Sequence, residues 1–309
     1  MRSVKAIRNI TVVTMDETRR IISDAVVAFD QGIIIAVGKE AEVELPADCP
    51  LIDGKGKIVL PGLIDTHAHA DQSLLRGLGD GMHWMPFLDD LIDPWLFNRE
   101  PTDGVLANQL SMIEMLKNGT TCFVSPNVDP GDDFALLTRS IGELGIRAVL
   151  GRFAMASEDF NQMISVMNEW HDAEEGLVSM WFGLDVPRRP GDQDYPDFYK
   201  AVKQESASLG VGIVYHFCSE TEDAAYIASH YGQRPAEWSR DNHALGENVL
   251  LINGCQVTPL EIEIIKDSGS HLTHSPVANM KMATGVLPVP DVLAAGVNLG
   301  IGTDGALNN

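Results

Sequence analysis

The sequence predicts an α/β protein, a (β/α)8 TIM barrel accompanied by a small N-terminal β-sandwich portion. Eight short apolar runs recur along the chain and are mostly separated by segments of helix length. This is the alternation expected of parallel strands joined by helices. Side chains able to bind metal follow several of these runs, and the chemistry of such barrels lies at the carboxyl ends of the strands. The 309 residues and 45% hydrophobic content are sufficient for one large domain with a small neighbour.

The first part of the chain carries strand and turn patterns. Val26–Phe29, for example, runs into the turn-forming sequence Asp30-Gln31-Gly32, and the apolar segment Ile33–Gly38 follows. We therefore predict that residues 1–60 form the small β-sandwich portion and that residues 61–309 form the barrel.

The barrel strands are expected at eight places. Before the second of them, helical spacing in Met112–Lys117 is followed by Gly119, a residue type that commonly ends a helix. The eight predicted strands are 63–69, 121–124, 147–150, 180–184, 212–216, 249–252, 271–274 and 297–301.

The sequence also predicts an uncovered edge. Asn309 is the last residue, and no helix follows the eighth predicted strand. We expect a barrel truncated after that strand, with the outer side of Val297, Leu299 and Ile301 exposed. Burying an apolar side chain of this size contributes about 1.5–3 kcal/mol, so we expect poor solubility or a homo-oligomer that covers the edge.

Composition restricts the class of partner. The formal net charge of −22 argues against nucleic acid and anionic membrane surfaces, because both are negatively charged. No apolar run is long enough to span a bilayer, and the first residues lack the apolar core of a signal peptide. The four cysteines show no paired spacing, as is usual in a reducing compartment. The sequence therefore favours a cytoplasmic protein whose partner is a small molecule.

Four side chains form a candidate metal site. His67 and His69 alternate along the end of the first strand, so both imidazoles should point the same way. His216 ends the fifth strand in V-Y-H-F-C-S-E-T-E-D, and Asp304 ends the eighth in G-I-G-T-D-G. Three imidazoles and a carboxylate suit one catalytic zinc ion with an open position for water, with iron as the alternative metal. The simpler interpretations are solvated loop histidines, a buried structural histidine and an ordinary turn aspartate.

Four segments carry a family resemblance: L-P-G-L-I-D-T-H-A-H with L-L-R-G, H-F-C-S-E-T-E-D, S-P-V-A-N-M-K-M-A-T-G-V-L-P-V-P and G-I-G-T-D-G-A-L-N-N. Together they resemble the amidohydrolase superfamily, specifically the branch of S-adenosylhomocysteine/methylthioadenosine deaminases, guanine deaminases and triazine hydrolases. The resemblance implies a metal-dependent barrel and hydrolytic removal of an amino group or a halide from a nitrogen heterocycle. By position, it implies that the metal ligands are His67, His69, His216 and Asp304.

The implied chemistry requires an acid near the metal. Coordination lowers the pKa of water to about 7, so a metal-bound hydroxide is available at neutral pH to attack a ring carbon. The leaving nitrogen must then be protonated, and Glu220 is the candidate acid; a surface glutamate at a helix start is the alternative. Asp304 could also take a proton from the attacking water. Some relatives bridge two metals with a carboxylated lysine, which Trp181–Asp185 lacks, and this favours one metal.

The chain departs from the family pattern in three places. The family carries its acid three residues after the fifth-strand histidine, but Ser219 stands there and Glu220 lies one residue further on. Either a β-bulge re-aims Glu220 or the acid is displaced. Asn253 ends the sixth strand, where the family has a histidine that orients water and substrate. The family also continues beyond the eighth strand with a helix and further sandwich strands, which we expect to be lacking here.

Two residues are candidates for binding substrate. Trp84 follows the first strand in a segment where relatives contact substrate; a buried aromatic anchor is the alternative. Asn279, with Lys281 beside it, lies in S-P-V-A-N-M-K, which matches a loop that shapes the mouth of the site. An ordinary loop at a helix start is the alternative for this segment.

The preferred interpretation is a metal-dependent hydrolase of non-peptide carbon–nitrogen bonds, an aminohydrolase that deaminates a purine-type or related heterocycle. A triazine-type chlorohydrolase is the alternative within the same class. The alternative from another class is a catalytically impaired or incomplete metal-binding member of the family. Asn253 favours impairment, because asparagine cannot carry the positive charge of a protonated histidine. We therefore predict bound metal together with slow turnover.

Overall fold

The computed structural model describes residues 4–129, 131–154, 156, 160–184, 186–188 and 195–308. The chain divides into two compact units, Met1–Gly62 and Leu63–Asn309. None of the described helices combines the length and the apolar character needed to cross a membrane.

The first unit contains a five-stranded sheet. Its elements are β1 (Lys5–Val13), β2 (Ile21–Asp30), β3 (Ile33–Lys39), the 3-10 helix η1 (Glu40–Glu42), β4 (Leu51–Asp53) and β5 (Ile58–Val59). The strand order is β3-β2-β1-β4, with β5 also paired to β1. Alternate residues of β2 reach opposite faces, so Ala25 and Val27 join one apolar cluster. Val26 and Ala28 join the other.

The second unit contains eight parallel strands, one from each predicted apolar run, and the predicted TIM barrel is confirmed. The strands are β6 (Leu63–Asp65), β7 (Thr120–Val128), β8 (Arg147–Ala154), β9 (Val178–Leu184), β10 (Ile213–Phe217), β11 (Val249–Asn253), β12 (His271–His274) and β13 (Leu299–Ile301). They pair in chain order from β6 to β13. Their carboxyl ends therefore lie at one end of the barrel.

The first and last strands meet and nearly close the sheet. The Thr66 amide donates to the Ile301 carbonyl at 3.0 Å. The Asp304 amide donates to the His67 carbonyl at 2.8 Å. Gly302 permits this approach, since a Cβ there would lie only 2.6 Å from the Cβ of His67. The seam thus brings His67 and Asp304 side by side.

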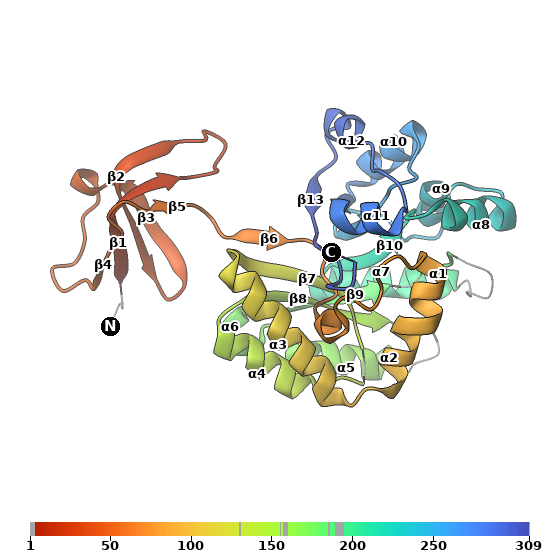
Figure 1. The fold of residues 1–309 in the computed structure, drawn as a ribbon. Helices are drawn as coiled ribbons and strands as arrows, with labels where there is room; N and C mark the ends of the chain where they lie inside the picture. Colours follow the sequence, from red (N-terminus) through yellow and green to blue (C-terminus); the bar gives the residue numbers. More distant parts are fainter. Residues whose placement is uncertain are drawn as a thin grey trace. The chain divides into compact units, whose positions relative to one another are not determined.

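Helices connect the strands and lie around the outside of the barrel (Figure 1). The helix α3 (Pro101–Lys117) ends before Gly119, as predicted; the φ of 89° at Gly119 is left-handed, which glycine adopts without strain. The other helices are η2 (Ala70–Leu75), α1 (Trp84–Phe87), the π-helix η3 (Leu88–Ile92), α2 (Asp93–Asn98), α4 (Phe134–Leu144), α5 (Phe160–Trp170), α6 (Ala173–Gly176), α7 (Pro196–Leu209), α8 (Thr221–Tyr231), α9 (Pro235–Asp241), α10 (Pro259–Ser268), α11 (Pro276–Met282) and α12 (Val289–Ala295).

The prediction that Val297, Leu299 and Ile301 form an uncovered edge is wrong for Val297. Val297 is only 5% exposed and belongs to the main apolar core. The reason is that its amide donates to the Val292 carbonyl at 3.2 Å, so the chain turns back against α12 before β13 begins. Leu299 is partly buried against the same core, whereas Ile301 is 68% exposed.

We expect Gly183→Ala to destabilise the barrel, because the added methyl group would meet backbone that cannot move aside. A Cβ at Gly183 would overlap the Pro126 carbonyl oxygen and lie 2.9 Å from that of Gly151. Overpacking of this kind typically costs about 1–3 kcal/mol, measurable as the free energy of unfolding in urea. Gly131→Ala is the control, because its Cβ would meet only the Asp129 carboxylate, at 3.1 Å. An unfolding free energy unchanged by Gly183→Ala would contradict this packing.

Candidate active site

His67 and His69 lie in the segment after β6, not within the strand as the sequence predicted. The chain leaves the strand early because it turns into η2 directly after His69, whose carbonyl accepts from the Gln72 amide at 3.2 Å. The Ala68 amide donates to the Val124 carbonyl at 2.8 Å on one side. The His67 carbonyl accepts from the Asp304 amide on the other. The two imidazole rings nevertheless meet, with centroids 4.8 Å apart.

The structure brings all four predicted metal ligands together. His216, in β10, places its Nε2 3.2 Å from the Nε2 of His69. Asp304 Oδ1 lies 3.4 Å from His67 Nε2 and 3.7 Å from His69 Nε2. The three imidazoles offer nitrogen atoms that all lie within 4.8 Å of one another. The first, fifth and eighth strands of the barrel thus contribute to one compact set of donor atoms.

This donor set fits a divalent ion. Both ring nitrogens of His67 are buried without a hydrogen-bond partner, so a ring nitrogen is free to bind an ion. Burial lowers the pKa of His69 to about 4 and also lowers that of His216, so both rings keep their lone pairs at neutral pH. A tetrahedral zinc ion with Zn–N distances of about 2.0–2.1 Å needs ligand atoms roughly 3.3 Å apart. The separations of 3.2, 3.4 and 3.7 Å are close to this value.

Asp304 is held ionised and sharply turned. Burial alone would raise the pKa of its carboxyl, but the nearby imidazoles, His67 above all, outweigh burial and lower it. Its φ of 66° is left-handed, a conformation in which aspartate and asparagine are the most tolerated residues after glycine. Cys218 and Asn253 also have positive φ, of 47° and 78°. Three strand ends therefore turn abruptly where they reach the site.

Asp65 connects the segments that carry His67 and Asp304, a role that sequence reasoning missed. Its side chain is buried, 4% exposed, and accepts from the His67 amide at 3.2 Å. It also accepts from the Thr303 amide at 3.0 Å and from the Thr303 hydroxyl at 2.5 Å. The carboxylate therefore fixes the chain next to His67 and next to Asp304 at once. An acidic residue directly after the apolar pair Leu63-Ile64 was the available signal.

Glu220 projects into the wall of the site although it lies one residue later than the family pattern. The left-handed turn at Cys218 follows β10 directly and redirects the chain before Glu220. The Glu220 side chain is 6% exposed, and its Oε2 has no hydrogen-bond partner. Burial, reinforced by the charge of Asp223, raises the pKa of Glu220 to about 8. Glu220 is therefore protonated at neutral pH and able to donate a proton.

Asn253 ends β11 beside this turn. Its Nδ2 donates to the Ser219 hydroxyl at 3.0 Å, whereas its Oδ1 is buried without a partner. Ser219 is in turn held by its own amide, which donates to Asp223 Oδ2 at 2.9 Å. Asn253 and Glu220 thus both present an unpaired oxygen at the same wall of the site.

A cavity of about 720 Å³ opens beside these groups. Trp84 and Asn279, the predicted substrate contacts, both line it and are each only 3% exposed. The Trp84 Nε1 has no partner, while Asn279 Nδ2 donates to Cys255 Sγ at 3.0 Å. Lys281 instead pairs with Asp80 at 3.0 Å. The part of the lining that comes from α1, η3 and α2 is largely apolar and includes Phe87, Leu88, Ile92, Leu96 and Phe97.

Several polar residues of the cavity were not predicted. Gln72, Thr284 and Asn308 line it, and each has a buried side-chain oxygen without a partner. Arg188 also lines it, and its guanidinium lies 6.0 Å from the centroid of the Trp84 ring. Asn308 falls inside the family-like segment G-A-L-N-N, which was a usable signal. The others carry no sequence pattern that separates them from surface residues. Asp185, considered above in the one-metal argument, lies outside the described residues.

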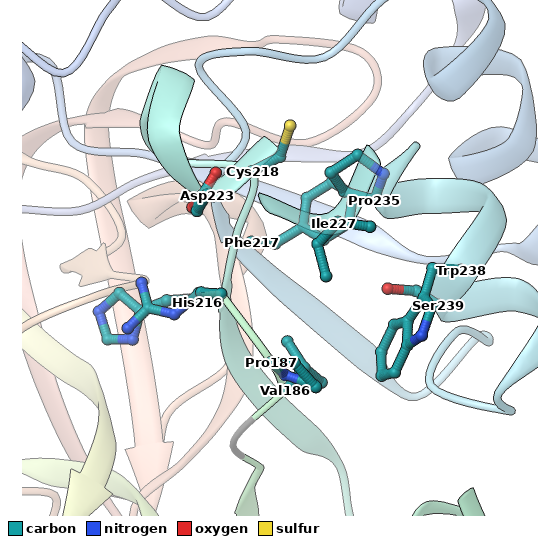
Figure 2. Close-up of a pocket in the computed structure, with 11 residues that line it drawn as sticks. Val186, Pro187, His216, Phe217, Cys218, Asp223, Ile227, Pro235, Trp238 and Ser239 are labelled. Atoms are coloured by element: carbon teal, nitrogen blue, oxygen red, sulfur yellow. The ribbon is translucent and has the colours of Figure 1, made fainter. Parts of the chain in front are cut away.

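Behind His216 lies another, much smaller cavity of about 10 Å³, roughly the space of one water molecule. Figure 2 shows β10 on one side of it and the side chains of Ile227, Pro235 and Trp238, from α8 and α9, on the other. Ile227 and Trp238 are buried, with 4% and 2% of their surfaces exposed. This close packing supports β10 from behind and, with it, the position of His216.

Comparison with known sequences places the chain in a family. A model described as "Amidohydrolase family" matches residues 58–309. The chain is 30% identical over 296 residues to a 5-methylthioadenosine/S-adenosylhomocysteine deaminase of Halobacterium salinarum, covering 93% of this chain and 65% of the deaminase. It is 28% identical over 310 residues to a 5'-deoxyadenosine deaminase of Methanosarcina mazei, covering 98% and 69% of the two proteins. The chain thus spans about two thirds of the length of these relatives.

Solved structures share the fold. An adenosine deaminase from Xanthomonas campestris with bound zinc superposes with a TM-score of 0.83 at 26% identity, covering 98% of this chain and 70% of that one. A triazine hydrolase from Arthrobacter aurescens superposes with a TM-score of 0.87 at 24% identity, covering 99% and 73%. Because the family model covers residues 58–309 of the 309, the chain belongs to the amidohydrolase family.

Proposed function

We propose that this protein is a metal-dependent hydrolase that removes an amino group from a nitrogen heterocycle, with a purine-type ring as the preferred substrate. The observation that carries the proposal is the convergence of three imidazoles and Asp304 at the edge of a cavity that Glu220 also lines. The deaminases among the relatives support the same reaction class.

We assign the metal to His67, His69, His216 and Asp304, and we favour zinc over iron. Three neutral imidazoles with one carboxylate are a usual zinc donor set, and the related adenosine deaminase structure holds zinc. A bound ion would act as a Lewis acid and lower the pKa of water to about 7. We propose one ion per chain, because the described residues contain one such cluster of metal-binding groups.

Two carboxyl groups would divide the proton transfers between them. Glu220, whose pKa is raised by burial, is the group suited to hold a proton and give it to the nitrogen of the substrate. Asp304, whose pKa is lowered, is ionised and can accept a proton from the attacking water. Their opposite environments assign the acid and the base, as is common where two carboxyl groups act in one site.

The cavity suits a substituted heterocycle. Its volume of about 720 Å³ lies within the roughly 300–1,000 Å³ typical of small-molecule sites. The apolar wall, with Trp84 and Phe87, can pack against a ring face, and the unpaired oxygens of Gln72, Thr284 and Asn308 can accept from its substituents. With a net charge of −22, nucleic acid remains an unfavourable partner. A cytoplasmic location and a homo-oligomer remain predictions from sequence.

The test is product release by the purified, zinc-loaded protein. Aminopurine nucleosides, aminotriazines and chlorotriazines should be supplied in parallel, with ammonia and chloride both measured. We expect ammonia from at least one aminopurine substrate. Chloride release alone would favour the second candidate, a triazine-type chlorohydrolase, which the fold similarity to the triazine hydrolase keeps open. Release of neither product by metal-loaded protein would favour the impaired member of the family.

A further inference from the structure

We infer that Ser219 and Asn253 make this site select an amino group over a halide as the leaving group. Asn253 Oδ1 accepts a hydrogen bond from an N–H of the amino group that is to be removed. Ser219 is a positioning residue, which holds the Asn253 amide so that this oxygen faces the ligand. The inference rests on the proposed function and concerns how that site chooses between its two candidate reactions.

The orientation of Asn253 follows from its contacts. Its Nδ2 donates to the Ser219 hydroxyl oxygen at 3.0 Å. Its Oδ1 is buried and has no hydrogen-bond partner, and the side chain, 6% exposed, lines the large cavity. A buried carbonyl oxygen without a partner is costly unless a ligand supplies a donor. The cavity wall therefore carries an acceptor that a donor on the ligand can satisfy.

The two residues form a rigid pair. Ser219 is 1% exposed, and its amide donates to Asp223 Oδ2 at 2.9 Å, which ties it to the first turn of α8. The strand ends that carry the pair are also joined, because the Gly254 amide donates to the Phe217 carbonyl at 2.9 Å. In this orientation the Ser219 hydroxyl accepts from Asn253 Nδ2; a rotated amide would instead accept from that hydroxyl and present Nδ2 to the ligand, and the ligand pairs below distinguish the two orientations.

An amino-substituted heterocycle complements this wall. It presents a donor, the amino N–H, next to an acceptor, the ring nitrogen. Asn253 Oδ1 can pair with the amino group, while Glu220, in the same cavity wall, can donate to the ring nitrogen when protonated. A chloro-substituted ring offers the same acceptor but only lone pairs at the reacting position. It would leave Asn253 Oδ1 unpaired, and sites built to bond a polar group discriminate strongly against analogues that lack it.

The test compares ligands that differ only at the reacting position. One pair is adenosine and 6-chloropurine riboside, and another is a triazine carrying either an amino group or chlorine at one ring carbon. Their affinities are measured by calorimetry on zinc-loaded Glu220→Gln protein, in which turnover is suppressed. We expect the amino form of a pair to bind about ten- to a hundredfold tighter than its chloro form.

Two substitutions in the pair should abolish the preference for the amino form, and a third should preserve it. Ser219→Ala releases the Asn253 amide and should bring the ratio close to one without loss of zinc. Asn253→Gly removes the acceptor and should do the same, since glycine tolerates the φ of 78°. Asn253→Asp keeps an oxygen in place and should preserve the ratio. Ser140→Ala is the matched control, because Ser140 is equally buried, 2% exposed, but lies in α4.

Two results would overturn the inference. One is equal or tighter binding of the chloro forms by protein with Asn253 intact, which is expected if the amide presents Nδ2 instead. The other is a ratio that Ser219→Ala leaves unchanged. The proposed function fails separately: the wild-type protein would then release neither ammonia nor chloride, while the binding preference persisted. Ammonia release without any binding preference would refute the inference and leave the function standing.

Discussion

Replacing His67 by alanine is expected to remove the bound metal and reduce hydrolysis to background. The His67 ring has no exposed surface, and neither of its nitrogens has a hydrogen-bond partner in the protein. Loss of a partner that merely orients a ligand typically costs about 10–100-fold in metal affinity, so loss of a direct ligand should cost more. Metal analysis of purified protein should fall from about one ion per chain to a small fraction of that, and turnover should fall in parallel.

The matched control is His271→Ala. His271 begins β12 at the opposite end of the barrel, where its Nε2 lies 3.0 Å from the Glu247 carbonyl oxygen. This variant should keep its metal and its activity. Full metal retention by His67→Ala, and by Asp304→Ala as well, would mean that the ion binds elsewhere or not at all.

The second large effect is expected from Glu220→Gln. Glutamine fills the same space but cannot give up a proton as a carboxylic acid does, and general acid catalysis typically contributes about 10²–10⁴-fold. Turnover should fall by that order while the metal content stays unchanged, because Glu220 is not among the clustered metal-binding groups. The measurements are kcat and metal stoichiometry on the same sample. An unchanged kcat would assign the acid to another group.

Glu220→Gln should also change how stability depends on pH. The pKa of Glu220 is about 8 in the folded protein, above its ordinary value of 4.5, so the folded state binds the extra proton. Stability should therefore decrease as pH rises from about 4.5 through 8, by roughly 2–5 kcal/mol from this group.

Glu220→Gln should flatten that dependence of stability on pH. The measurement uses metal-free protein, because a bound cation would itself lower the pKa of Glu220. Part of the slope should remain, because burial raises the pKa of Asp223 to about 6. An identical slope in both proteins would contradict the buried, protonated Glu220. The charged groups that act on Glu220 are Asp223, Arg188, Glu222 and Asp304.

The strands of the barrel were predictable because each is a short apolar run, and pairing in chain order follows from their alternation with helices. The metal ligands were predictable for a related reason. A histidine at the end of a buried strand, such as His216, falls at the carboxyl end of the barrel wherever the other strands lie. Local pattern and topology together were enough to bring His67 and Asp304 to the same place.

What the sequence could not provide depends on contacts between distant residues and on individual backbone angles. The link from Asp65 to Thr303 joins residues 238 positions apart, which no local pattern reveals. The left-handed turn at Cys218 is carried by a residue type with no preference for it. The predicted extent of the first strand was wrong because the chain turns at His69, whose carbonyl accepts from the Gln72 amide at the start of η2.

The seam that Asp65 and Thr303 close is also expected to form late in folding. Joining segments so far apart in the chain is entropically expensive and slower than pairing neighbouring strands. His67 and Asp304 stand beside these two residues, so a partly formed barrel cannot offer the complete donor set. A ligand that binds only the closed form stabilises that form by mass action. A bound metal would therefore hold the first and last strands of the barrel together. Its loss should first open the seam between these two strands, while the remaining strands stay paired.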